Sequence, residues 1–393
     1  MVEPVAAFGR LKNESAFEVL ARAAALEAAG KSVINLGIGQ PDFKTPEHVV
    51  EAAIKALRDG HHGYTPANGI LPLREAVAAD LQVRRSVEVD PGRILVVPGG
   101  KVTMFFAIVM FGEPGAEILY PNPGFPIYES TIAYTGSTPV AVPLRESEGF
   151  AMTAEAVLKR ITPNSRLLIL NSPANPTGGV TPAEELDKLV AGLAAHPQVA
   201  ILSDEIYSRL LYDGREHRSL LQYPEIADRL IMLDGWSKTY AMTGWRLGYG
   251  VWPEHLVDAA IRLAVNCHSC VNAATQHAGI AALEGPQDSV EAMAAAFTER
   301  RALVLRTLNQ IPGLRAVEPG GAFYAFPNIS ETGLTAKEME LGLLEEAGVA
   351  TIAGTSFGRE GEGYLRISYA NSLENIEEAM ARIRRWLAAG GAD

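Results

Sequence analysis

The sequence predicts an α/β protein with a mainly parallel sheet that has helices on both faces. Short apolar runs rich in β-branched residues indicate buried strands, and helical patterns separate most of them. The expected strands are Arg93–Val97, Glu117–Tyr120, Leu167–Leu170, Val199–Leu202 and Leu230–Leu233, and helices between them include Lys101–Phe111, Ala183–Ala195 and Glu254–Ala264. Parallel sheets bind ligands beyond the carboxyl ends of their strands, so we expect the functional site there.

The segment before the first strand has the clearest helix signals. Thr45 is a suitable N-cap, Pro46 suits the first turn, and Gly60 suits the end of the helix. The apolar residues that fall on one face are Val49, Val50, Ala53, Ile54 and Leu57. An earlier helix is expected over Ser15–Ala29, ended by Gly30.

The last part of the chain predicts a second, smaller α/β unit. It begins with a long Ala- and Arg-rich helical stretch, about Ser289–Asn309. Short strands follow at Ala322–Phe326, Ala350–Ile352 and Tyr364–Tyr369, with helices at Ala336–Ala347 and Leu373–Leu387.

Composition limits the possible functions. The 393 residues carry a net charge of −12, which argues against a nucleic-acid partner because phosphate neutralisation needs clustered Lys and Arg. Two cysteines cannot form a disulfide framework or supply the roughly four ligands of a zinc site, so we expect no metal. The longest apolar stretch, Val102–Phe111, is too short for a membrane span, and the N-terminus lacks signal-peptide features. We therefore expect a soluble cytoplasmic protein.

Polar residues follow three consecutive strands of the predicted sheet. They are Asn171 and Asn175, Asp204 and Tyr207, and Ser237 and Lys238. Each alone fits a loop residue that forms a turn or a cap. An acid, a phenol, an amide and a lysine at one edge of a sheet together indicate a site for a heteroaromatic cofactor.

Lys238 lies in the aromatic- and glycine-rich segment GWSKTYAMTGWRLGYG. A lysine among apolar aromatic side chains loses its proton more easily, as a Schiff-base nucleophile must. Arg246 follows eight residues later, and its planar guanidinium suits a phosphate. The alternative is a lysine that packs through its aliphatic stem in a loop.

Gly99, Gly100 and Lys101 stand between a strand and a helix in VPGGKVTMFFA. Free backbone N–H groups at such a helix start can bind an anion. The segment lacks the Walker A pattern, and LGIGQPDF has Asp42 where a dinucleotide-binding motif needs its third glycine. The alternative is a glycine turn without a ligand.

Six segments together resemble the class I aminotransferases, which are pyridoxal-phosphate enzymes of fold type I. They are GIGQPDF (37–43), YTPANG (64–69), NSPANPTGG (171–179), SDEIY (203–207), SKTYAMTGWRLGY (237–249) and YLRISYA (364–370). The resemblance implies a large domain over residues 45–283 with a mostly parallel seven-stranded sheet. It also implies a discontinuous small domain, residues 1–44 and 284–393, and a homodimer with shared active sites.

The implied reaction moves an amino group from an L-amino acid to a 2-oxo acid by a ping-pong aldimine/ketimine mechanism. Lys238 then carries pyridoxal 5′-phosphate and afterwards moves the Cα proton. Asp204 pairs with the pyridinium nitrogen, while Asn175 and Tyr207 hydrogen-bond the phenolic oxygen of the cofactor. The phosphate ligands implied are Arg246, Ser237, the amides of the Gly99–Lys101 loop, and Tyr64 of the neighbouring subunit.

Arg366 matches the arginine that binds the substrate α-carboxylate in this family, although a structural salt bridge is an alternative for it. Gly39 and Asn175 are implied to lie at the same carboxylate. Phe125 occupies the position of the aromatic residue that stacks on the cofactor ring, where many relatives have tryptophan.

The donor stays open between two classes. No arginine occurs between Arg262 and Arg300, where one dicarboxylate-specific branch has one. In another branch the lysine at the position of Lys101 reads the distal carboxylate with hydroxyl residues, but Ala16 stands where we align a threonine. Aspartate or glutamate is one hypothesis. An aromatic or aliphatic amino acid is the other, with a pocket formed by Phe17, Ile38, Phe125 and Phe357.

Two other functions fit the same scaffold. One is another pyridoxal-phosphate reaction, such as that of a β-eliminating C–S lyase or an aminocyclopropane-carboxylate synthase. The other is a non-enzymatic regulator, for which the roughly forty residues before Gly39 leave no room for an added DNA-binding unit. With Lys238, Asp204, Arg246 and Arg366 all present, we expect an enzyme.

Overall fold

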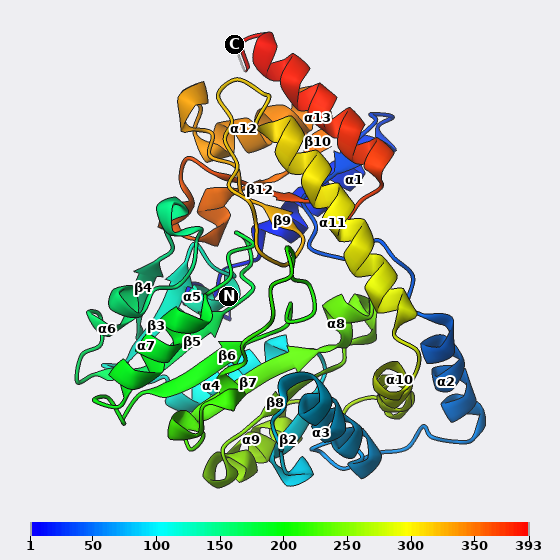
Figure 1. Ribbon diagram of the computed structural model, residues 1–393, viewed down its shortest axis with the longest axis vertical. Helices are drawn as coiled ribbons and strands as arrows, with labels where there is room; N and C mark the ends of the chain where they lie inside the picture. Colours follow the sequence, from blue (N-terminus) through cyan, green and yellow to red (C-terminus); the bar gives the residue numbers. More distant parts are fainter. Residues whose placement is uncertain (1, 392–393) are drawn as a thin grey trace.

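The computed structural model describes residues 2–391, and a seven-stranded sheet forms its larger part (Figure 1). The strands are, in spatial order, β2 (Ile94–Val97), β8 (Gly248–Val251), β7 (Leu230–Gly235), β6 (Ala200–Asp204), β5 (Ser165–Asn171), β3 (Glu117–Asn122) and β4 (Thr138–Pro143). β8 is antiparallel to β2 and β7, and the pairs from β7 to β4 are parallel. The predicted α/β class with a mostly parallel sheet is confirmed.

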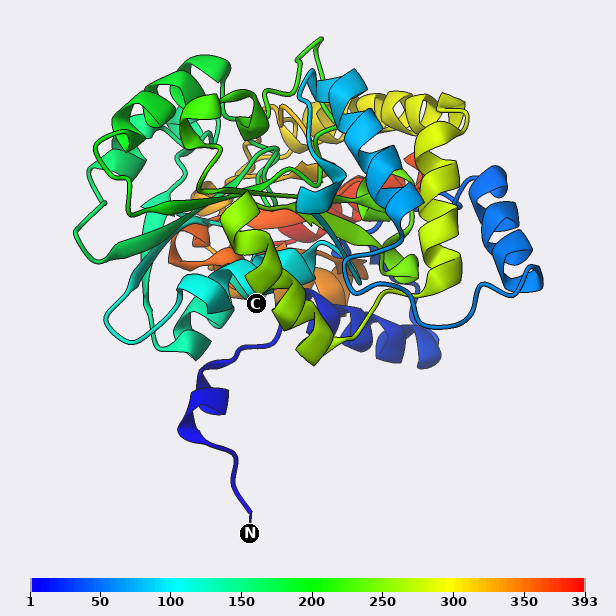
Figure 2. The same ribbon diagram turned by 90° about the horizontal axis from the view of Figure 1, so that it is seen from below.

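Helices cover both faces of this sheet (Figure 2). On one face lie α4 (Lys101–Phe111), α5 (Ile127–Thr135) and α9 (Glu254–Cys267). On the other lie α3 (Leu71–Arg85), α6 (Ala154–Leu158), α7 (Ala183–Leu193) and α10 (Ala273–Glu284), with α2 (Glu47–Arg58) packed on α10. The short helix α8 (Trp236–Thr239) follows β7 directly.

The apolar runs form strands because each side chain finds a hydrophobic layer whichever way it points. In β5, Leu167 and Ile169 pack towards α4 and α9, whereas Leu168 and Leu170 pack in the core on the opposite face. Successive strand residues point to opposite faces. A strand that is buried on both faces therefore has no polar alternation, and its polar residues collect at its end.

A second unit lies above the carboxyl ends of the large sheet in Figure 1. Its helices are α1 (Ser15–Ala28), α11 (Asp288–Leu308), α12 (Ala336–Gly342) and α13 (Leu373–Ala388). Its strands are β9 (Tyr324–Ala325), β11 (Ile352–Ala353) and β12 (Leu365–Ser368) in one antiparallel sheet, and β1 (Ile34–Asn35) paired with β10 (Val349–Ala350). Tyr207 and Tyr212, which follow β6, belong to the core of this unit and so connect it to the large sheet.

Several local expectations were wrong. Thr45 does not cap α2; Pro46 holds the N-cap position, and Thr45 donates a hydrogen bond to the carbonyl of Ala241. The single strand expected over Ala350–Ile352 is divided, since β10 ends at Ala350 and β11 begins at Ile352 in another sheet. The helix expected over Ala336–Ala347 changes to a π-helical turn at Leu343.

Three strands, β1, β4 and β8, were not predicted, and two of them, β4 and β8, belong to the large sheet. β4 reads TPVAVP, and prolines disfavour a strand assignment, but this strand lies at the edge of the sheet, where proline is tolerated. β8 reads GYGV, and its glycines let the backbones of Gly248 and Gly100 approach so closely that a Cβ atom would not fit. Within the described residues, no helix is long and apolar enough to cross a membrane.

Candidate active site

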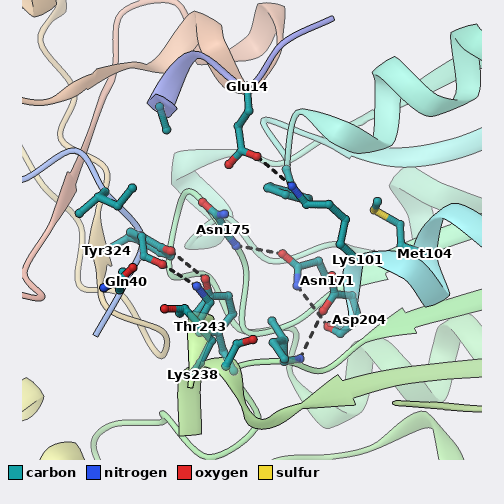
Figure 3. Close-up of a pocket in the computed structure, with 18 of the residues that line it drawn as sticks. Glu14, Gln40, Lys101, Met104, Asn171, Asn175, Asp204, Lys238, Thr243 and Tyr324 are labelled. Carbon is teal, nitrogen blue, oxygen red and sulfur yellow. Dashed lines mark hydrogen bonds and ion pairs between the residues drawn. The ribbon is translucent and has the colours of Figure 1, made fainter. Parts of the chain in front are cut away.

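A pocket of about 470 Å³ lies where the carboxyl ends of the large sheet meet the second unit. Its floor includes the ends of β5 and β6, at Asn171 and Asp204, and the start of α8, at Lys238. The opposite wall includes Tyr324 of β9 and Arg366 of β12. The two units thus enclose the pocket between them (Figure 3).

Asp204 is buried at the bottom of the pocket. Burial raises its pKa to about 6, although the hydrogen bond that Tyr128 Oη donates to Oδ2, at 2.7 Å, lowers it. The Asn171 amide donates to the backbone carbonyl of Asp204, and its oxygen accepts from the backbone N–H of Asn175. None of the described residues forms a salt bridge with this carboxylate, so a cation could bind there.

The next residue, Glu205, has the opposite environment. Burial would raise its pKa, but Arg85, at 2.8 Å, and His217 outweigh burial and lower it to about 2. Glu205 therefore already has its cationic partners, away from the pocket. Of two adjacent buried acids, only Asp204 is left available to a ligand.

Lys238 extends from α8 into the same space, and its Nζ donates a hydrogen bond to the carbonyl of Gly39 (Figure 3). Burial, followed by the charge of Arg366, lowers its pKa to about 8. Its ammonium lies 5.9 Å from the ring centre of Tyr207 and 5.8 Å from that of Phe323. Aromatic rings thus lie near this lysine, but neither belongs to the segment on which the prediction rested: Tyr207 follows β6, and Phe323 precedes β9 in the second unit.

Tyr207 and Tyr324 form a pair at one side of the pocket, with their hydroxyl oxygens 2.7 Å apart. A Cβ atom at Gly39 would collide with the Tyr324 hydroxyl. Glycine at this position therefore lets the backbone of the N-terminal segment pass close to the tyrosine pair and reach Lys238.

Arg366 is 2% exposed and lies between the rings of Tyr324 and Phe357, 4.7 Å from each ring centre. Its Nη1 donates to Asn175 Oδ1 at 2.9 Å, and Nη2 donates to the carbonyl of Gly37. Its Nε is buried without a partner. The structural salt bridge considered as an alternative is absent from the described residues. A buried guanidinium without a counter-ion favours an anionic ligand.

A second anion-binding end is formed by the loop before α4 and by Arg246. Gly99 has a φ of +94°, and a Cβ atom there would collide with the Arg246 guanidinium. Arg246 Nη1 donates to the carbonyl of Thr243 at 2.8 Å, and Ser237 lines the pocket nearby. The loop, the arginine and the start of α4 together form a cradle with free donors.

The predicted site residues nearly all come together. Those that line the pocket are Gly39, Gly100, Lys101, Phe125, Asn175, Asp204, Tyr207, Ser237, Lys238, Arg246 and Arg366. Gly99 lies behind the Arg246 side chain. Tyr64 is 93% exposed and does not line the pocket of its own chain, and Phe357 packs on Arg366 instead of lining the pocket.

Other lining residues were missed. They include Glu14, Gln40, Met104, Tyr128, Thr243, Gly244 and Tyr324. Tyr128 lies in the first turn of α5, three residues after Phe125, and the two rings pack edge to face. Glu14 and Tyr324 had no signal in the local sequence, since they reach the pocket only through the packing of the second unit.

The model of the family described as aminotransferase class I and II matches residues 31–383. The chain is 38% identical over 385 residues to aspartate aminotransferase of Geobacillus stearothermophilus, covering 96% of this chain and 97% of that protein. It is 40% identical over 360 residues to aromatic-amino-acid aminotransferase 2 of Thermococcus litoralis, covering 91% and 92%. A solved structure of Thermus thermophilus aspartate aminotransferase with maleate superposes with a TM-score of 0.93 at 35% identity, covering 98% and 100%.

The chain belongs to the class I and II aminotransferases. It has the fold type I architecture, depends on pyridoxal phosphate, and catalyses transamination. The pocket fits this cofactor in three respects. A lysine with a lowered pKa, a buried carboxylate without a salt-bridge partner, and a glycine cradle beside an arginine all face one cavity.

The environment of Lys238 predicts an abnormal titration in the cofactor-free protein. Because burial and Arg366 disfavour the charged amine, its pKa should lie near 8, so that roughly half is neutral at pH 8. We would measure it by NMR of ¹³C-methylated lysines, with Lys238→Arg to assign the signal. Lys55, which is exposed on α2, is the internal control. A Lys238 titration that coincides with that of the exposed lysines would contradict the burial argument.

Proposed function

We propose that this pocket holds pyridoxal phosphate between Lys238 and Asp204 and that an L-α-amino acid and a 2-oxo acid exchange their amino group there. The observation that carries the proposal is the convergence of Lys238, Asp204 and Arg366 on one cavity, none of them in a salt bridge among the described residues. When bound, the cofactor supplies a ring that accepts electrons from the substrate Cα.

Asp204 would hold the proton on the ring nitrogen. A buried carboxylate strongly favours a neighbouring cation, because pairing compensates for the burial that raises its pKa. Tyr128 fixes the orientation of this carboxylate through its hydrogen bond to Oδ2. Tyr207 and Asn175 would donate to the phenolic oxygen from the adjacent side of the pocket.

Lys238 would carry the cofactor and, once freed by the incoming amine, move the proton of the substrate Cα. An amine with a pKa near 8 can both accept and return a proton close to neutral pH. Its contact with the Gly39 carbonyl holds Nζ on the side of the pocket where the second unit approaches.

Arg366 would bind the α-carboxylate of the substrate. Its unpartnered Nε and the Asn175 side chain provide donors at that end, and the backbone of Gly39 lies on the same wall. Phe125 would lie against the cofactor ring, packed edge-on against Tyr128 with ring centres 5.7 Å apart. Arg246, Ser237 and the amides at Gly100 and Lys101 would bind the phosphate.

We also propose a homodimer and the division into residues 45–283 and residues 1–44 with 284–393. The exposed Tyr64 supports the dimer, as does a second cavity of about 720 Å³ that opens beside Arg246 and gives a neighbouring subunit access to the phosphate end. The hydrophobic core that contains α11, α12 and α13 supports the division, because most of its residues lie in the segments 1–44 and 284–393.

The end of the pocket that would receive the substrate side chain is lined by both apolar residues and a charged lysine. Ala16, Phe17, Ile38 and Phe125 form an apolar lining that supports an aromatic or aliphatic donor. Lys101 supports a dicarboxylic donor such as aspartate. The names of the relatives include both classes, aspartate and aromatic-amino-acid aminotransferases.

Half-reaction spectroscopy tests the proposal directly. The purified holoenzyme is mixed with single amino acids, and conversion of the cofactor to its amine form is followed by absorbance. We expect stoichiometric conversion with at least one aromatic, aliphatic or dicarboxylic amino acid and reversal by its 2-oxo acid. Ammonia and a 2-oxo acid released without an acceptor would instead indicate β-elimination and contradict the proposal.

Replacement of Arg366 should act mainly on substrate binding. Arg366→Gln removes a buried charge-assisted contact, so KM should rise about 100-fold or more with a smaller change in kcat. Arg366→Lys keeps the charge but not the fork and should be intermediate. Steady-state kinetics with a good donor measures the effect, and unchanged KM in both variants would refute the carboxylate role.

Gly99→Ala should weaken cofactor binding, because the added methyl group displaces the Arg246 guanidinium and the φ of +94° is strained for alanine. We expect the Kd for pyridoxal phosphate to rise about tenfold or more. Gly115→Ala, at a similar φ of +92° with open space around it, is the matched control for backbone strain alone. Equal losses of cofactor affinity in both variants would exclude the proposed cradle.

Subunit complementation tests the role of Tyr64. Lys238→Ala should abolish turnover, and Tyr64→Ala should lower cofactor affinity if this side chain serves the neighbouring site. Mixed dimers of the two variants would contain one complete site, so mixing inactive Lys238→Ala with Tyr64→Ala under subunit exchange should restore activity above that of either variant. No gain despite proven exchange would show that Tyr64 does not act across the interface.

A further inference from the structure

Glu14 and Lys101 form an ion pair inside the pocket, with Glu14 Oε2 3.1 Å from Lys101 Nζ (Figure 3). Both residues line the cavity, and the side chains are 18% and 43% exposed respectively. Glu14 holds the N-cap position of α1, yet its side chain does not cap the helix. The carboxylate leaves the free N–H groups of its own helix and reaches across to the start of α4.

The pair lies at the end of the pocket where a substrate side chain would sit. Lys101 Nζ is 5.1 Å from the ring centre of Phe125. Figure 3 shows Lys101 and Tyr324 on opposite sides of the cavity, and Arg366 packs on the Tyr324 ring. A substrate held by its α-carboxylate at Arg366 would reach Lys101 and Glu14 with a side chain that extends across the cavity.

Lys101 differs from two other side-chain cations that line the pocket, Arg246 and Arg366. Arg246 and Arg366 form no salt bridge with any described residue, so each is free to attract an anion. Lys101 already has an anionic partner. The pocket therefore offers net positive charge at its phosphate and α-carboxylate ends, but its side-chain end is close to neutral.

The neutral charge of the Glu14–Lys101 pair weakens the attraction of the pocket for a second, distal carboxylate of the substrate. A dicarboxylate would bring its distal group next to Glu14 as well as Lys101, and the repulsion from Glu14 offsets the attraction of Lys101. An apolar side chain meets Phe17, Ile38 and Phe125 without that penalty. Opposite charges a few ångströms apart also shield one another, so the pair exerts little field on an uncharged substrate.

We propose that Glu14 is a specificity-determining residue that neutralises Lys101 and thereby selects aromatic or aliphatic donors over dicarboxylic ones. The inference rests on the proposed function in one respect, the binding of the substrate α-carboxylate at Arg366. Glu14 does not touch the reacting atoms in this arrangement and acts through the charge at the side-chain end.

Binding of unreactive analogues to the holoenzyme is the direct test. Maleate represents the dicarboxylic class and 3-phenylpropionate the aromatic class, and calorimetry gives Kd for both without turnover. The wild type should bind 3-phenylpropionate more tightly than maleate. Glu14→Gln should lower the Kd of maleate about tenfold or more and change that of 3-phenylpropionate much less. Glu14→Asp, which retains the charge, should restore the weak binding of maleate.

Charge variants separate an electrostatic role from a structural one. Maleate affinity should follow the net charge of the pair. It should be highest in Glu14→Gln, where the pair is positive, and lowest in Lys101→Met, where the pair is negative. The wild type and the double variant Glu14→Gln/Lys101→Met, in which the pair is neutral, should have similar intermediate affinities. A variant that merely disturbed α1 would not give this order. Glu18→Gln, an exposed acid in the first turn of α1, is the matched control and should leave both Kd values unchanged.

The kinetic counterpart is the ratio of kcat/KM for aspartate to that for phenylalanine. Glu14→Gln should raise this ratio at least about tenfold, mainly through KM for aspartate. Unchanged maleate binding in Glu14→Gln, or a wild type that prefers maleate, would overturn the inference even if transamination is established. If the enzyme does not transaminate but the variants show the predicted order of maleate affinities, the proposed function fails and the inference about Glu14 stands.

Discussion

Desolvation of a few ionisable groups at the carboxyl ends of parallel strands is the constraint on which the rest of the molecule depends. The second unit covers this edge of the sheet, where Asp204 is buried and Lys238 is half-buried. Burial, with the charge of Arg366, lowers the pKa of the lysine to about 8, and burial raises the pKa of the acid to about 6 against the hydrogen bond from Tyr128. Both groups are thereby moved towards the pH at which a proton or a covalent bond is exchanged easily.

The end of β6 places two buried carboxylates with different environments next to each other. Glu205 and Asp234 share Arg85, and this closed network belongs to the structure. Asp204, one residue before Glu205, points the other way and has only hydrogen bonds from Tyr128 and the backbone of Ile206. Because successive side chains at the end of a strand point in opposite directions, Glu205 can stabilise the structure while Asp204 remains available to a ligand.

Much of the fold followed from local patterns, because the strands of the large sheet are buried on both faces and appear as continuous apolar runs. α4 begins and ends where predicted, at Lys101 and Phe111. The errors occur where tertiary contacts override local preference. β8 is a strand because its glycines allow close packing, and Ala350 and Ile352 enter different sheets because the first pairs with β1 and the second with β12.

The site was predictable to the extent that its residues follow strands or belong to family motifs. Asp204, Lys238 and Arg366 were found in that way. Tyr324 and Glu14 could not be, because each enters the pocket through the orientation of the second unit on the first. The Glu14–Lys101 pair joins positions 87 residues apart, and neither residue type nor spacing indicates that they meet.

The residues proposed to bind the cofactor and those at the side-chain end of the pocket come from different kinds of segment. This difference explains why local sequence is informative about reaction type but uninformative about substrate. The groups proposed to handle the cofactor lie at or just after the ends of β5, β6 and β7. The side-chain end is built from a helix start on one unit and the segment before α1 on the other. A single acid introduced on that segment can reverse the charge preference without disturbing the sheet. Specificity can therefore change by one residue while the fold and the chemistry stay fixed.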